Sequence, residues 1–278
     1  MCSSGAPMGA GSYGRSEGVT GLASIVRGGV RLVYDDLGAG PPVFFHTGAG
    51  GDASMWRAAG YLDALPVHRY LLFDHRGHGR SDTPRRTDEH RLQEYLADMV
   101  AVLDALDVAR TAFVGYSDGA HLGFALAAQH PERVSALVAI GAAVRSDDDD
   151  LSLRTHSAED IRRYGVRARI DAMIAAETEP APAWLVEMLC ATPAEMFALE
   201  LEGWADSPSA SSTFARIAAP TLIVCGERED PDRATELAAA ALPDGKAVTL
   251  PGLGHLQVFW RADLTAPIIA DFLRQQHC

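Results

Sequence analysis

Short apolar runs alternate with amphipathic stretches along most of the chain from residue 22 onward. Continuously apolar runs are typical of parallel strands that are covered on both faces, and a 3.6-residue period is typical of the helices that cover them. We predict strands at 22–26, 30–35, 42–46, 69–74, 111–114, 134–140, 220–225 and 247–250. We predict core helices at 54–65, 92–106, 232–242 and 259–275, with a further one directly after residue 117. This order predicts an α/β fold with a mostly parallel eight-stranded sheet flanked by helices.

The alternation stops after residue 144, where helical patterns follow one another without a strand. Amphipathic stretches cover 158–176, 182–190 and 193–204. We therefore predict a helical cap at 145–215, inserted between core parts at 19–144 and 216–278. The cap would lie over the carboxyl ends of the strands, where open α/β sheets place their sites. The acidic run at 147–150 is interpreted as a solvated hinge and helix start; calcium binding is the less favoured alternative, because the EF-hand spacing is missing.

Composition excludes several classes of partner. The net charge of −13 argues against binding to nucleic acid or to an anionic membrane surface. Residues 1–18 are rich in glycine, serine and alanine, which predicts a disordered tail rather than a signal peptide or anchor. The cysteines are far apart and lack metal-ligand spacing, which favours free thiols: Cys2, Cys190, Cys225 and Cys278. We expect a cytoplasmic protein that acts on a small molecule; the sequence does not indicate its oligomeric state.

The strongest chemical signal is Gly-Tyr-Ser-Asp-Gly at residues 115–119, between a predicted strand and a predicted helix. In that context Gly-x-Ser-x-Gly is a nucleophile elbow, a sharp turn that exposes the hydroxyl of Ser117 above the sheet. The flanking positions must be small so that strand and helix can approach closely. The N–H of Asp118, at the start of the helix, could face a developing oxyanion. The alternative is an ordinary strand-to-helix turn with an exposed serine.

A nucleophilic serine needs a base, and the base needs a carboxylate that orients it. His255 lies in a glycine-lined loop just past the last predicted strand, where it could swing over the strand ends. The loop after strand 220–225 offers three carboxylates: Glu227, Glu229 and Asp230. The chain order serine, acid, histidine is that of α/β-hydrolases.

At these motifs the chain resembles capped α/β-hydrolases of the esterase, lactonase and cofactor-free haloperoxidase kind, from about residue 30 to its end. The matching pieces are residues 115–119, Asp-His-Arg-Gly-His-Gly-Arg-Ser at 74–81, the loop from Gly226, and Pro-Gly-Leu-Gly-His at 251–255. The sequence contains no metal-binding or cofactor motif, so we expect no cofactor and no metal. A serine at position 117 argues against a haloalkane dehalogenase, which would need aspartate there.

Two departures from the family pattern concern the site. Relatives usually have His-Gly after the third strand; here Thr47-Gly48 fills that place, and His46 stands one residue early. The resemblance then implies an oxyanion hole formed by the N–H groups of Ala49 and Asp118.

The second departure concerns the acid. The usual position, three residues after the strand-ending glycine, is held by Glu229, but an Asp-Pro pair like Asp230-Pro231 is also frequent. We favour Asp230, with Glu229 as the close alternative.

The predicted reaction is cleavage of an ester, lactone or thioester of a small to medium, mainly apolar substrate through an acyl-enzyme on Ser117. The predicted pocket residues are apolar, aromatic or near strand ends: His46, Gly48, Met55, Trp56, Tyr116, Trp184, Met188 and Trp204. Any one of the large apolar side chains could instead pack the interior. Two other functions stay open: non-hydrolytic acyl transfer or cyclisation in a biosynthetic pathway, and ligand binding without turnover.

Overall fold

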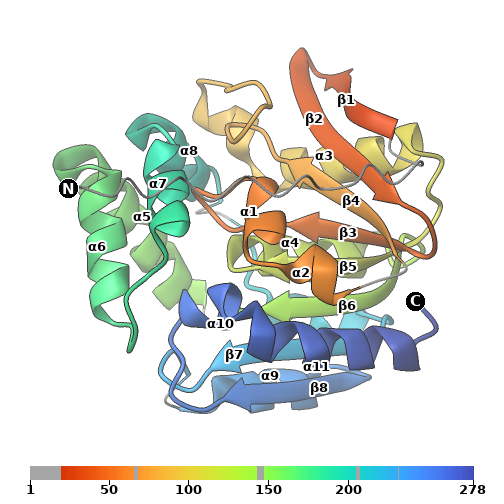
Figure 1. Cartoon of the computed structure of the whole chain (residues 1–278). Helices are drawn as coiled ribbons and strands as arrows, with labels where there is room; N and C mark the ends of the chain where they lie inside the picture. Colours follow the sequence, from red (N-terminus) through yellow and green to blue (C-terminus); the bar gives the residue numbers. More distant parts are fainter. Residues whose placement is uncertain (1–19, 66–67, 143–146, 205–206, 231) are drawn as a thin grey trace, which may run out of the picture.

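A computed structural model describes residues 20–65, 68–142, 147–204, 207–230 and 232–278. Eight strands form one sheet in the order β1-β2-β4-β3-β5-β6-β7-β8 (Figure 1). The strands are β1 (Thr20–Arg27), β2 (Val30–Gly38), β3 (Pro42–His46), β4 (Arg69–Asp74), β5 (Thr111–Tyr116), β6 (Val134–Ile140), β7 (Thr221–Gly226) and β8 (Gly245–Leu250). The predicted α/β class with a mostly parallel eight-stranded sheet is confirmed.

The sheet is antiparallel at one edge only. β1 pairs with β2, and β2 pairs with β4, in antiparallel register; all the other neighbours are parallel. Parallel strands present their carboxyl ends at one edge of the sheet, so the loops after β3, β5, β6, β7 and β8 meet there. This convergence brings together residues that are far apart in the sequence.

Consecutive residues of the central strands face opposite sides of the sheet, and both sides are buried. Phe44 packs in one apolar cluster and Phe45 in the other, and Phe113 and Val114 divide in the same way. Burial on both sides explains why these strands show continuous apolar runs rather than alternating ones.

Helices cover both faces of the sheet. α3 (Leu92–Ala105), α4 (Asp118–Gln129) and α9 (Ala234–Ala241) contribute to the cluster that contains Phe44. The cluster that contains Phe45 includes residues of α1 (Ser54–Ala58), α2 (Tyr61–Ala64), α10 (Gln257–Trp260) and α11 (Ala262–Gln275). The helices predicted at 54–65 and 259–275 are therefore each divided in two. The break in the first lies at Gly60, whose φ of 89° interrupts helical geometry.

Four helices lie between β6 and β7 in the sequence and form the block at the left of Figure 1: α5 (Asp147–Tyr164), α6 (Val166–Ala175), α7 (Ala183–Ala191) and α8 (Ala194–Gly203). The structure ends α5 at Tyr164, where the sequence pattern predicted one helix over 158–176. Short 3₁₀ turns occupy Thr87–His90 (η1) and Ser211–Arg216 (η2). Within the described ranges, no helix has the length and apolar character that crossing a bilayer requires. The predicted tail at 1–18 lies outside those ranges.

Candidate active site

Ser117 occupies a strained turn between β5 and α4. Its backbone angles are φ 54° and ψ −120°, a region that non-glycine residues seldom adopt. A Cβ on Gly115 would lie 2.3 Å from the carbonyl oxygen of Gly119, and a Cβ on Gly119 would lie 2.4 Å from that of His46. Both positions therefore need glycine, which is the physical content of the Gly-x-Ser-x-Gly pattern.

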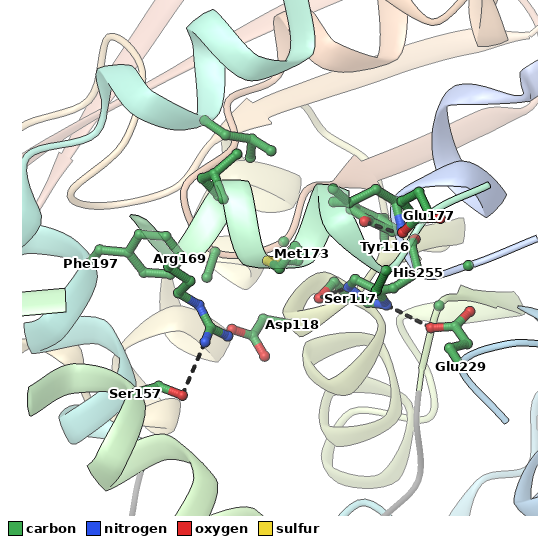
Figure 2. A pocket seen from close by; sticks show the side chains of 18 of the residues that line it. Tyr116, Ser117, Asp118, Ser157, Arg169, Met173, Glu177, Phe197, Glu229 and His255 are labelled. Carbon is green, nitrogen blue, oxygen red and sulfur yellow. Dashed lines mark hydrogen bonds and ion pairs between the residues drawn. The ribbon is translucent and has the colours of Figure 1, made fainter. Parts of the chain in front are cut away.

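A chain of two hydrogen bonds joins three loops at the carboxyl edge of the sheet (Figure 2). His255 Nε2 lies 3.1 Å from the hydroxyl oxygen of Ser117. On the other side of the ring, Nδ1 lies 2.6 Å from Oε2 of Glu229. A histidine held between a hydroxyl and a carboxylate is the arrangement that activates a serine nucleophile.

The structure brings Glu229, and not the favoured Asp230, to His255. The side chain of Asp230 is buried, and its Oδ2 accepts the backbone N–H of Thr235 at 3.0 Å. Glu229 is held beside His255 by a second hydrogen bond, because its Oε1 accepts the N–H of Gly226 at 2.9 Å. Glu227 instead accepts the N–H of Gly252 at the surface. The preference for Asp230 is therefore corrected to Glu229.

Three carboxylates act on the charge of His255. Burial by itself would lower the pKa of the imidazole. The charge and hydrogen bond of Glu229 raise it, and the charges of Glu177 and Asp118 raise it further. The pKa of His255 therefore lies above its usual 6.5. Tyr116 stacks on the ring with centroids 5.3 Å apart, and its hydroxyl donates to the carbonyl oxygen of His255. The surroundings thus hold the ring in place and favour its protonated form.

A cavity of about 530 Å³ opens beside Ser117 and His255, between the strand-end loops and the helical block. The wall from the core includes Gly48, Ala49, Tyr116, Asp118, His121 and Gly141. The wall from the inserted helices and the loop after α6 consists of Ser157, Arg169, Ile170, Met173, Ala176, Glu177, Leu189, Phe197 and Leu201. The predicted residues Gly48, Ala49, Tyr116 and Asp118 are therefore present at the cavity.

The expected oxyanion donors lie on both sides of Ser117. A Cβ on Gly48 would meet the Cβ of Ser117 at 2.7 Å, so the loop that continues into Ala49 packs directly against the nucleophile. Asp118 begins α4 immediately after the serine. Their N–H groups remain the predicted oxyanion hole.

Six other predicted pocket residues lie elsewhere. Met55, Trp56 and His46 are buried beneath the loops: Trp56 packs edge-on against Tyr61 and Phe259, and His46 stacks on His75. Trp204 packs edge-on against Tyr95, away from the cavity. Trp184 and Met188 on α7 pack against the apolar cluster that contains Phe45. Large aromatic side chains bury more apolar area in the core than they would at the wall of an open pocket, which favours the core position.

Sequence reasoning missed the contribution of α6 and the segment after it. Arg169, Ile170 and Met173 reach the cavity from one side of this helix, and Glu177 follows its end (Figure 2). Arg169 donates to the hydroxyl of Ser157 at 3.1 Å. The helical period was visible in the sequence, but the side that faces the cavity depends on how the block of helices α5 to α8 packs against the rest of the fold.

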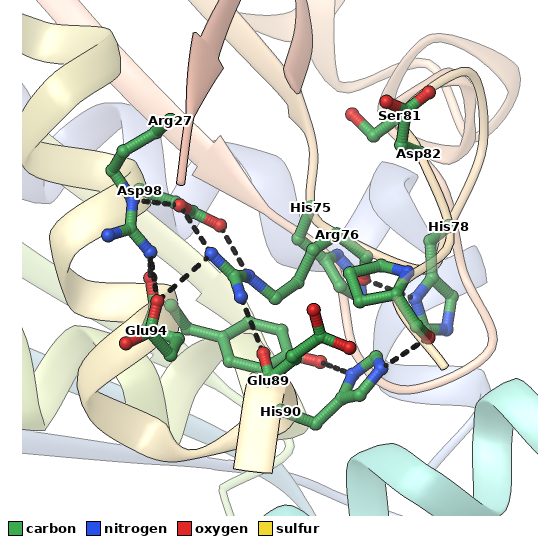
Figure 3. Close-up of polar contacts among 12 residues, drawn as sticks. Arg27, His75, Arg76, His78, Ser81, Asp82, Glu89, His90, Glu94 and Asp98 are labelled. Atoms are coloured by element: carbon green, nitrogen blue, oxygen red, sulfur yellow. Dashed lines mark hydrogen bonds and ion pairs between the residues drawn. The ribbon is translucent and has the colours of Figure 1, made fainter. Parts of the chain in front are cut away.

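The loop after β4 is anchored to α3 by a buried ion pair (Figure 3). The guanidinium of Arg76 donates to both oxygens of Asp98, at 2.7 and 2.8 Å, and Arg27 donates to the same carboxylate. Such a bidentate pair fixes orientation as well as charge. The hydroxyl oxygen of Ser81 accepts the N–H of Val33 at 2.8 Å, which closes the loop onto β2. Residues 74–81 therefore hold the surrounding loop in place and do not line the cavity.

His75, His78 and Glu200 form a buried histidine–carboxylate group that does not line the cavity. The ring nitrogens of His75 and His78 lie 3.4 and 3.3 Å from the carboxylate of Glu200, which α8 supplies. Among the described residues this is the group whose atoms could surround a metal ion. However, His78 Nε2 already accepts the N–H of Gly50 at 3.0 Å, and the centroids of the two rings lie only 4.0 Å apart. The group fits a buried polar contact between α8 and the loop after β4 better than a metal centre.

Comparisons with known proteins agree with this geometry. The family model for the alpha/beta hydrolase fold matches residues 41–188, which is more than half of the chain. "Putative non-heme bromoperoxidase BpoC" of Mycobacterium tuberculosis is 28% identical over 269 residues, covering 87% of this chain and 97% of that protein. "Putative carbamate hydrolase RutD" of Azorhizobium caulinodans is 36% identical over 121 residues, covering 43% of this chain and only 44% of that relative.

A solved structure extends the likeness over nearly the whole chain. The enol-lactonase of Burkholderia xenovorans LB400 is 26% identical, with a TM-score of 0.76, and the match covers 91% of this chain and 100% of that one. The family match and this solved relative lead to one conclusion: this chain is an enzyme that belongs to the alpha/beta hydrolase fold family.

Proposed function

We propose that this protein is a serine hydrolase in which Ser117 attacks an acyl carbonyl, His255 takes the proton and Glu229 orients the imidazole. The observation that carries the proposal is the continuous hydrogen-bonded chain from Ser117 through His255 to Glu229 at the wall of a cavity. As the bond from Oγ to the carbonyl carbon forms, the proton passes to Nε2 and then to the leaving group. Water then attacks the acyl carbon and gives a proton to Nε2 of His255. That proton passes to Oγ of Ser117 as the bond between Oγ and the acyl carbon breaks and the acid is released.

The N–H groups of Ala49 and Asp118 would stabilise the oxyanion of the tetrahedral intermediate, each contributing about 3 kcal/mol to the transition state. The cap side of the cavity is mainly apolar, with Ile170, Met173 and Phe197 among its residues. We infer an ester, lactone or thioester substrate with a mainly apolar acyl part. The name of the enol-lactonase relative supports a cyclic or linear ester as the class to test first.

Labelling with a fluorophosphonate tests the nucleophile before the substrate is identified. We expect one adduct, located on Ser117 by peptide mapping, and no adduct in Ser117→Ala; His255→Ala should slow labelling strongly. Ser157→Ala is the matched control, because Ser157 also lines the cavity but lies on the cap beside Arg169. An unlabelled wild-type protein that is folded and has an open pocket would refute the proposal and favour a binding protein.

Turnover of an ester and lactone panel in H₂¹⁸O then separates hydrolysis from transfer. Hydrolysis places one ¹⁸O atom in the released acid, since water attacks the acyl-enzyme. A product without the label would instead indicate acyl transfer or cyclisation.

A further inference from the structure

A short cap segment lies against the loop that carries His255. Glu177 follows α6, and its Oε1 accepts the backbone N–H of Leu256 at 2.8 Å. Thr178 donates its N–H and its hydroxyl to the side-chain oxygen of Gln257, at 3.1 and 2.9 Å. The cap therefore bonds to the two residues that directly follow His255.

Glu177 also packs closely on the residue that precedes His255. A Cβ on Gly254 would lie 2.1 Å from Oε2 of Glu177, so a larger residue there would displace the carboxylate from its present position. This oxygen is buried, and no described residue offers it a hydrogen bond. Burial raises the pKa of Glu177, although the backbone N–H groups of Leu256 and Gln257 and the charge of His255 oppose the rise. A carboxylate in such surroundings is poorly screened and acts strongly on a nearby charge.

The same cap segment is bonded to the loop that carries the acid. Arg228, the residue before Glu229, donates Nε and Nη2 to the carbonyl oxygen of Ala176 at 3.3 and 3.2 Å. Residues 176–178 thus touch both the loop of the base and the loop of the acid.

We propose that Glu177 is a positioning residue for His255, a second carboxylate that holds the histidine loop from the cap and stabilises the imidazolium formed when Ser117 loses its proton. This inference rests on the proposed hydrolase function. The charged groups that face His255 are then Glu229 from the loop after β7, Asp118 from the start of α4 and Glu177 from the cap, and the neutral Tyr116 stacks on the ring. Glu229 fixes the tautomer through Nδ1, whereas Glu177 acts on the ring through charge and on the loop through Leu256.

The substitution Glu177→Gln separates charge from structure, because the amide oxygen can still accept the N–H of Leu256. The rate at which the fluorophosphonate labels Ser117 should rise with pH as His255 loses its proton. In Glu177→Gln we expect the midpoint of this rise at lower pH, because the imidazolium loses a stabilising charge. The plateau rate at high pH should also fall. Glu179→Gln is the matched control: Glu179 lies two residues further on and pairs with Arg261 at the surface, so its profile should equal that of the wild type.

A second readout does not depend on chemistry at Ser117. The NMR titration of the His255 ring should have a lower midpoint in Glu177→Gln than in the wild type and in Glu179→Gln, and Glu177→Asp should recover part of the difference. An unchanged midpoint and labelling profile in a folded Glu177→Gln protein would overturn the role of Glu177 while leaving the hydrolase intact. Absence of labelling in the wild type would overturn the hydrolase function instead.

Discussion

The group of His255 and Glu229 and the group of His75, His78 and Glu200 share the same residue types but differ in their surroundings. His255 has a close partner, Glu229 at 2.6 Å, and its pKa is raised. His75 and His78 lie farther from Glu200, at 3.4 and 3.3 Å, and burial lowers their pKa values to about 3 and about 4. His255 can accept and hold a proton near neutral pH, whereas His75 and His78 stay uncharged. The two groups thus differ in the placement of the carboxylate and in access to the cavity, which His255 lines and His75 and His78 do not.

The largest predicted effect compares one histidine from each group. His255→Ala should lower kcat/KM by about 10³-fold or more, because the serine loses its base. His75→Asn should change kcat/KM little, since His75 does not line the cavity, and should alter the urea midpoint instead. Steady-state kinetics on an ester found in the panel, with urea unfolding of both variants, checks this. Equal losses of activity in the two folded variants would contradict the comparison.

The carboxylates are the next pair to compare. Glu229→Gln should lower kcat by about 10²- to 10⁴-fold, because an amide neither fixes the required tautomer nor stabilises the imidazolium. Asp230→Asn keeps an oxygen for the N–H of Thr235 and should stay close to the wild type. Single-turnover rates at saturating substrate are the measurement. If Asp230→Asn shows the larger loss, the acid is Asp230 after all.

Buried histidines should make the fold sensitive to acid. His46, His75 and His78 have pKa values of about 3, 3 and 4 in the folded protein, against about 6.5 in the unfolded chain. Below pH 6.5 the unfolded chain therefore binds protons that the folded protein does not, and stability falls with falling pH. Each histidine contributes at most about 1.4 kcal/mol per pH unit. Urea unfolding between pH 7 and 5 measures the slope, and His75→Asn should flatten it; an identical slope in that variant would refute the assignment.

The sequence predicted those parts of the site that have local signatures. Ser117 is marked by glycines that the close approach of β5 and α4 requires, and His255 by its position after the last strand. The sheet was predictable for a similar reason, because burial on both faces leaves continuous apolar runs. The choice between Glu229 and Asp230 could not be predicted from the sequence, because it depends on which way a single turn directs two adjacent side chains.

The pocket was predicted least well, for two physical reasons. Aromatic residues such as Trp56 gain more from burial in the core than from lining a cavity, so their type alone gives no location. Packing of α6 against the rest of the fold determines which of its sides faces the cavity with Arg169 and Met173, and this packing involves contacts distant in sequence. Glu177 was missed for the same reason: its partner Leu256 is far away along the chain.

The smallest predicted effect is a displacement of the pH profile, and it tests the raised pKa of His255 directly. The base must be neutral to accept the proton of Ser117, so kcat/KM should rise with pH through the pKa of His255 in the free enzyme. Because the carboxylates around the ring raise that pKa, the midpoint of the acid limb should lie above 6.5. In Glu229→Gln the residual activity should have its midpoint at lower pH, since the first of these carboxylates is gone. A profile between about pH 4.5 and 9, recorded where urea unfolding shows both proteins to be folded, keeps this effect apart from acid unfolding caused by His75 and His78. A wild-type midpoint below 6.5 would mean that burial outweighs the carboxylates at His255, and the contrast between the two histidine groups would then be lost.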